Sequence, residues 1–136
     1  MCMRIFYDPN KANRTAAQIA PGAWDIDRYP FVRFDYRIPE GVPVAIELTP
    51  FGGPDRPGAF TMGGTANRPE RATDLDAYAL IDDGQWHTIT MDVRRVREAY
   101  PELQHLRQFM FLTNWTEDAG QEFWFDEFAI LPEGAE

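Results

Sequence analysis

Several aromatic side chains lie in irregular stretches of the sequence, where they have no obvious core to fill. Trp115 lies in a polar loop between two expected strands, and Trp24 and Tyr29 precede the first strongly alternating stretch. Flat aromatic rings stack on the apolar faces of sugar rings, while polar neighbours bond the hydroxyl groups. The sequence therefore predicts a ligand-binding set of Trp115, Asn114, Trp24, Tyr29 and Arg107. Covering the loop is the alternative for Trp115, and core packing is the alternative for Trp24 and Tyr29.

Carboxylates offer a second kind of chemistry, because two of them roughly 5 to 10 Å apart can hydrolyse a glycosidic bond. Two adjacent acidic pairs are present, Glu117-Asp118 and Asp126-Glu127. Neighbouring residues on a strand face opposite sides, so Asp126 and Glu127 cannot act together on one substrate. The chain also has no serine, one lysine and only two histidines. Serine nucleophiles, P-loops and histidine-rich zinc sites are thereby excluded, and no catalytic residue is predicted.

Composition limits the partners that this chain can have. A length of 136 residues fits one domain, 1–136, and 44% hydrophobic residues suit a packed core. The formal charge of −9 disfavours nucleic acid and anionic membranes, which attract Lys and Arg. The apolar runs are shorter than the roughly 20 residues that a membrane helix needs. Cys2 is the only cysteine, so no internal disulfide can form.

The elements that must position these residues are short strands with turn signals at intervals of roughly ten residues. Alternation is clearest over 31–38, where Val, Phe, Tyr and Ile occupy one side and Arg and Asp the other. This strand and the next are expected to form a hairpin through the turn at 39–41, and 16–20 is expected to be a connection. A short helical link is expected over 94–100. The expected strands cover 1–7, 31–38, 42–48, 59–62, 77–81, 86–93, 106–113 and 122–131.

The simplest interpretation of two side chains at the start of the strand over 86–93 is that their roles are structural. Trp86 follows the turn Asp82-Asp83-Gly84 and is expected to cover one end of the fold. His87 shares a side with Ile89 and Met91, which predicts a buried histidine whose hydrogen bonds are satisfied.

The stretch Asp83-Gly84-Gln85-Trp86-His87, and the later Phe123-Trp124-Phe125-Asp126-Glu127-Phe128, resemble the closing half of known β-modules. These are the jelly-roll modules of the carbohydrate-binding and galactose-binding-like type, found in secreted, multidomain bacterial proteins. The resemblance implies an all-β, antiparallel jelly-roll sandwich of about eight strands with one short helical connection. It also implies an extracellular location within a longer protein whose other domains are neighbours of this module. In many relatives a structural Ca²⁺ binds at the position of Asp126, and the alternative here is that Asp126 bonds the nearby backbone.

The last expected strand has apolar residues on both faces. Trp124, Phe128 and Ile130 alternate with Phe123 and Phe125, whereas a strand of a two-layer sandwich needs only one apolar face. The second face is expected to line a ligand groove, pack under a loop or contact another domain.

Three hypotheses follow from these features. The first is a non-catalytic module that binds polysaccharide. The second is a structural or interaction domain of a larger secreted protein. The third is a small β-sandwich carbohydrate-active enzyme that works through carboxylates.

Overall fold

The computed structural model describes residues 2–6, 15–19, 22–52, 57–68, 73–113 and 122–134. These residues form short strands and one 3-10 helix, η1 (Val93–Glu98), which lies between two strands. The strands are β1 (Cys2–Phe6), β2 (Thr15–Ile19), β3 (Trp24–Asp25), β4 (Phe31–Arg37), β5 (Val44–Phe51), β6 (Phe60–Gly64), β7 (Asp74–Ala79), β8 (Trp86–Asp92), β9 (His105–Thr113) and β10 (Glu122–Leu131).

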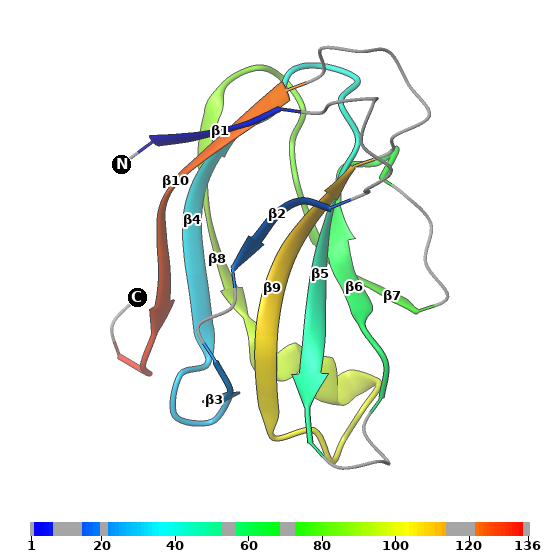
Figure 1. The fold of residues 1–136 in the computed structure, drawn as a ribbon, viewed down its shortest axis with the longest axis vertical. Coiled ribbons are helices and arrows are strands. Elements are labelled where there is room, and N and C mark those ends of the chain that lie inside the picture. The colour runs from blue at the N-terminus through cyan, green and yellow to red at the C-terminus, as the bar shows by residue number, and fades with distance from the viewer. Residues whose placement is uncertain are drawn as a thin grey trace.

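The strands form two sheets that pack as two layers (Figure 1). The first sheet has the order β1-β10-β4-β8, and the second has the order β2-β9-β5-β6-β7, with β3 also paired to β9. The strand pairs are antiparallel except for β6 and β7, which run parallel. The prediction of an all-β sandwich with one short helical connection is confirmed.

Two local predictions are wrong. The expected hairpin of 31–38 with 42–48 does not form, because β4 pairs with β8 and β10 while β5 pairs with β6 and β9. The turn at 39–41 therefore carries the chain from one sheet to the other. The stretch 16–20 was expected to be a connection, but residues 15–19 form β2 at the edge of the second sheet. The partners of β4 and of β2 lie far along the chain, so local alternation and turn residues did not reveal them.

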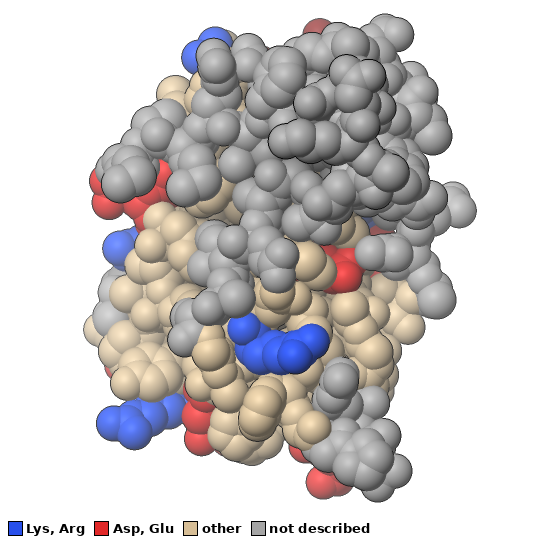
Figure 2. Space-filling model, in the orientation of Figure 1, with Lys and Arg blue, Asp and Glu red and all other residues tan. Residues whose placement is uncertain are grey.

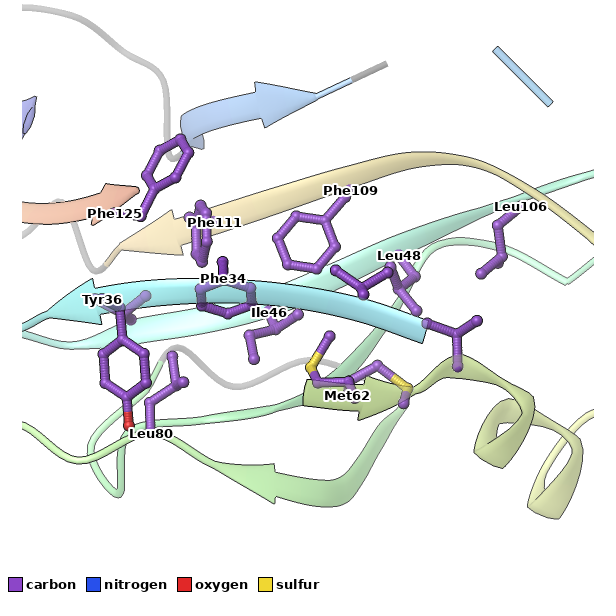
Figure 3. Packing of buried hydrophobic residues seen from close by; sticks show 14 of the residues in the cluster. Phe34, Tyr36, Ile46, Leu48, Met62, Leu80, Leu106, Phe109, Phe111 and Phe125 are labelled. Carbon is purple, nitrogen blue, oxygen red and sulfur yellow. The ribbon is translucent and has the colours of Figure 1, made fainter. Parts of the chain in front are cut away.

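The core lies between the inner faces of the two sheets and is rich in aromatic rings. In Figure 3, Phe109 and Phe111 extend from β9 toward Phe34 of β4. The Phe34 and Phe111 ring centroids are 5.3 Å apart in an edge-to-face arrangement, which is a favourable geometry for aromatic pairs. Phe109 and Phe111 are therefore core residues, and their hydrophobic character needs no ligand to explain it.

A β-bulge in β10 explains the apolar residues that appeared to occupy both faces of this strand. Asp126 pairs with Asp35, but Ala129 pairs with Arg33, so β10 has one more residue than β4 over this stretch. The bulge contains Glu127 at φ 53°, and it turns Phe128 inward beside Phe125. The predicted face shared by Trp124, Phe128 and Ile130 is thus wrong, because Phe128 and Ile130 pack against the core with Phe123 and Phe125.

The second sheet depends on two glycines where its strands approach closely. Gly63 and Gly64 in β6 have φ values of 138° and 147°, in the region that favours glycine. A Cβ on Gly63 would lie 2.0 Å from the carbonyl oxygen of Tyr78, and one on Gly64 would lie 2.2 Å from that of Val44. Both positions therefore require glycine on steric grounds.

The charged side chains of the described residues do not gather into one broad patch on the face in Figure 2. There the Lys and Arg side chains and the Asp and Glu side chains form small separate groups. Within the described residues, no helix has the length and hydropathy needed to cross a membrane.

Candidate functional site

The outer face of the first sheet exposes a tryptophan at the start of β8. Trp86 is 47% exposed and pairs across the strands with Arg37, which also faces solvent. The alternation of β8 directs His87, Ile89 and Met91 toward the core side, so the preceding residue Trp86 must point outward. The expectation that Trp86 covers the end of the sandwich is wrong for this reason.

The turn before β8 fixes the direction of Trp86. The carboxylate of Asp83 accepts a hydrogen bond from the Gln85 backbone N–H and lies 2.9 Å from His87 Nε2. Gly84 has φ 76°, and its N–H donates to the carbonyl oxygen of Ile38, the residue after β4. The Gln85 N–H and the His87 ring both hold the pKa of Asp83 below its usual value. His87 is thus hydrogen-bonded as predicted, although it is half-buried and not fully enclosed.

Two rows of side chains cross β10, β4 and β8 on this face. One row contains Trp124, Arg37 and Trp86, and the second contains Asp126, Asp35 and Thr88. Residues directly opposite each other on antiparallel strands share a face, so each row lies on the outer surface. We call these six residues the outer-face site.

In the first row, Arg37 connects Trp124 to the turn that carries Trp86. Its Cζ lies 5.0 Å from the centre of the Trp124 ring, and its Nε donates to the carbonyl oxygen of Gly84 at 2.8 Å. A guanidinium held over an aromatic face in this way is attracted by the ring's negative face. The Arg37 side chain is therefore held by two contacts, one with the Trp124 ring and one with Gly84 in the turn before β8.

In the second row, polar groups line a shallow pocket. The Thr88 hydroxyl donates to Asp35 Oδ1 at 2.6 Å, and Asp126 lies opposite Asp35 on β10. The pocket has a volume of about 180 Å³ and is lined by Asp35, Trp86, His87, Thr88 and Asp126. It therefore combines one exposed aromatic ring with two carboxylates and a hydroxyl.

The bulge in β10 supports this pocket. The N–H of Glu127, the residue with positive φ, donates to Asp126 Oδ1 at 2.8 Å. Asp126 thus accepts a backbone hydrogen bond, which was the alternative to a calcium ligand. Bulges often lie beside binding sites, where they redirect a side chain.

The residues predicted to bind ligand have different surroundings where the structure describes them. Asn114 and Trp115 lie outside the described residues. Trp24 is 7% exposed in the core, and its Nε1 has no hydrogen-bond partner among the described residues. Tyr29 packs against the core, and Arg107 is an exposed residue of β9 in the second sheet.

The structure instead places Asp126 beside residues that sequence reasoning did not select. Asp35 and Arg37 share the polar side of β4, and Trp86 and Thr88 share one side of β8. Alternation within each strand indicated which residues share a side. The pairing of β4 with both β8 and β10 was the missing information, because these strands are far apart in the sequence.

Two carboxylates lie opposite each other at the position of the predicted calcium. Asp126 faces Asp35, and in the described part of the chain no group of three or more His, Cys, Asp or Glu side chains is arranged to hold a metal ion. Calcium takes about six to eight oxygen ligands. A calcium at Asp126 stays a prediction.

Comparison with known proteins adds no relative. No protein-family model matches this chain, and no match was found among curated proteins or among solved structures.

Proposed function

We propose that this chain is a non-catalytic module that binds polysaccharide at the outer-face site. The observation that carries the proposal is the exposure of Trp86 on a regular strand, beside the hydrogen-bonded pair of Asp35 and Thr88. A large aromatic ring normally packs away from water, so its exposure on a rigid sheet suits a stacking partner. The carboxylates beside it are suited to accept hydrogen bonds from sugar hydroxyls.

The strand order supports the jelly-roll part of the same proposal. Apart from the short β3 and the parallel β7, the strands divide into β1-β10-β4-β8 and β2-β9-β5-β6. The first and last strands pair with each other, and β2 pairs with β9, as in a long hairpin rolled into two sheets.

Affinity electrophoresis tests the binding function. The full chain is run through gels that contain soluble β-glucan, xylan, mannan, galactan or pectin, and slower migration marks binding. Trp86→Ala is expected to lower the affinity for the retarding polysaccharide at least tenfold, because aromatic residues at the centre of an interface contribute most of the binding energy. Phe51→Ala is the matched control, because Phe51 is 52% exposed but lies at the end of β5 in the second sheet.

Two results would contradict the proposal. One is a folded wild-type protein that migrates equally in every gel. The other is a Trp86→Ala variant that binds as well as the wild type.

A carbohydrate-active enzyme is the second candidate, because Asp35 and Asp126 lie directly opposite each other. Cβ atoms in such pairs are about 4.5–5.5 Å apart, and the carboxyl groups of retaining glycosidases are about 5–5.5 Å apart. This arrangement predicts release of reducing sugar from one of the same polysaccharides, and its loss in Asp35→Asn. Binding without hydrolysis would leave the non-catalytic module as the function.

The location and the partners belong to the same proposal. The polysaccharides of this panel lie outside cells, so the module is proposed to act in a secreted protein with neighbouring domains. The hypothesis of a structural or interaction domain depends on a second apolar face of β10 that contacts another domain. Phe123, Phe125 and Phe128 instead pack into the core. Without this second apolar face, the binding module is favoured over the interaction domain.

A further inference from the structure

The pocket of the outer-face site is smaller than a complete oligosaccharide needs. Its volume is about 180 Å³, whereas sites that enclose a drug-sized ligand have roughly 300–1,000 Å³. A pocket of this size holds one part of a sugar chain. If the proposed function is correct, the rest of a bound chain must lie over the surface beside the pocket.

The first row of the outer-face site provides such a surface. Trp124, Arg37 and Trp86 occupy paired positions on three adjacent strands. Adjacent strands are about 4.8 Å apart, so the backbones of the two tryptophans, which have one strand between them, are about 10 Å apart across the sheet. This separation is close to the length of a disaccharide unit in an extended polysaccharide.

Arg37 adds hydrogen-bond donors beside the two carboxylates of the pocket. Ionised carboxylates such as Asp35 and Asp126 only accept hydrogen bonds, while a sugar chain also presents ring and hydroxyl oxygens that need donors. The Arg37 Nε–H is directed at the carbonyl oxygen of Gly84. The terminal N–H groups belong to the same guanidinium, whose Cζ lies 5.0 Å from the centre of the Trp124 ring. Because these contacts already order the side chain, a hydrogen bond to a ligand would cost little further conformational entropy.

We propose that Arg37 and Trp124 form a second subsite, so that the outer-face site binds the interior of a glycan chain that runs across β8, β4 and β10. Trp86 stacks on one sugar residue over the pocket. Arg37 donates to the oxygens of a residue farther along the chain, and Trp124 holds the Arg37 guanidinium in place. This inference rests on the proposed function and adds the direction and length of its ligand.

Oligosaccharides of increasing length test the second subsite. Titration calorimetry with β-1,4-linked gluco-, xylo- and manno-oligosaccharides of two, four and six residues gives the dissociation constant at each length. For the wild type, affinity is expected to rise about tenfold between the disaccharide and the tetrasaccharide. Trp124→Leu is expected to remove this rise, so that the variant binds the tetrasaccharide no more tightly than the disaccharide, while Trp86→Ala weakens binding at every length.

Arg37→Lys provides a second variant in case Trp124→Leu fails to fold. Lysine keeps the charge but loses the planar group that lies over the Trp124 ring, so it should also remove the gain with length. Equal affinity for all lengths, or an equal loss at all lengths in either variant, would overturn the second subsite while the proposed function stands. Failure of the wild type to bind any of these oligosaccharides would overturn both.

Discussion

Strands β4 and β5 are neighbours in sequence and alternate in a similar way, but their outer faces have different surroundings. In β4, the outward residues Arg33, Asp35 and Arg37 are half-buried or exposed. In β5, the outward residues Ala45, Glu47 and Thr49 are all buried, with Glu47 only 3% exposed. Of these two central strands, only β4 has an outer face open to a ligand, and that face also carries the tryptophans of the neighbouring strands.

This difference shows that alternation describes a strand's own two sides but not what covers them. A strand with one solvated face carries charges there, as β4 does. The small and polar residues of β5 were compatible with solvent, yet the fold encloses them. The following predictions test whether the two outer faces differ in this way.

The largest expected effect comes from placing the same acidic residue on each outer face. Ala45→Asp puts a carboxylate at a fully buried position of β5 and is expected to lower the free energy of unfolding by about 3–5 kcal/mol. Arg33→Asp, on the outer face of β4, is expected to change it by less than about 0.5 kcal/mol. Urea denaturation of both variants measures the difference, and equal losses would show that the two faces are alike.

A smaller effect is expected from two threonine hydroxyls with different surroundings. Thr65 is fully buried, and its Oγ1 accepts a hydrogen bond from the Val44 N–H at 2.9 Å. Thr65→Val leaves this N–H without its partner and should lower the free energy of unfolding by about 1–3 kcal/mol. Thr88→Val on the exposed face should cost less than about 0.5 kcal/mol. Chemical denaturation decides, and a larger loss for Thr88→Val would reverse the comparison.

A substitution on the exposed face of β4 should affect binding more than stability. Asp35→Asn removes the negative charge of the carboxylate that lines the pocket and accepts from Thr88. It should weaken binding to the best polysaccharide of the panel by about tenfold, because hydrogen bonds to charged groups are worth about 1.5–3 kcal/mol. Asp76→Asn is the control, since Asp76 is exposed on β7 of the second sheet. Unchanged affinity of Asp35→Asn would remove this carboxylate from the site.

The smallest expected effect concerns pH and lies away from both outer faces. A hydrogen bond from Arg97 lowers the pKa of Asp27 to about 2 and connects the segment after β3 to η1. Because this pKa is depressed, the stabilisation is present above about pH 4 and is lost as the pH falls toward 2. Asp27→Asn should therefore be less stable than the wild type near neutral pH, with a deficit that shrinks below pH 4. Urea titrations at several pH values would show it, and a deficit that is constant with pH would contradict it.

The sequence predicted most strands because their side chains alternate, and it predicted the position of η1 between β8 and β9. It did not predict that β4 and β5 belong to different sheets, since alternation carries no information about partners. The bulge at Glu127 was also missed, because a residue at positive φ that is not glycine gives no clear signal. Both omissions affect the candidate site, whose residues come from three strands and include the bulge.

The pairing of β4 also has a consequence for how the chain folds during synthesis. Its partners β8 and β10 begin at Trp86 and Glu122, long after β4 ends at Arg37, and β1 pairs with β10 as well. Ribosomes add about 5–20 residues per second, so β4 emerges several seconds before its last partner is made. In the second sheet, β5 meets β6 almost at once. The open face that carries the candidate site is therefore expected to be among the last parts of the molecule to become ordered.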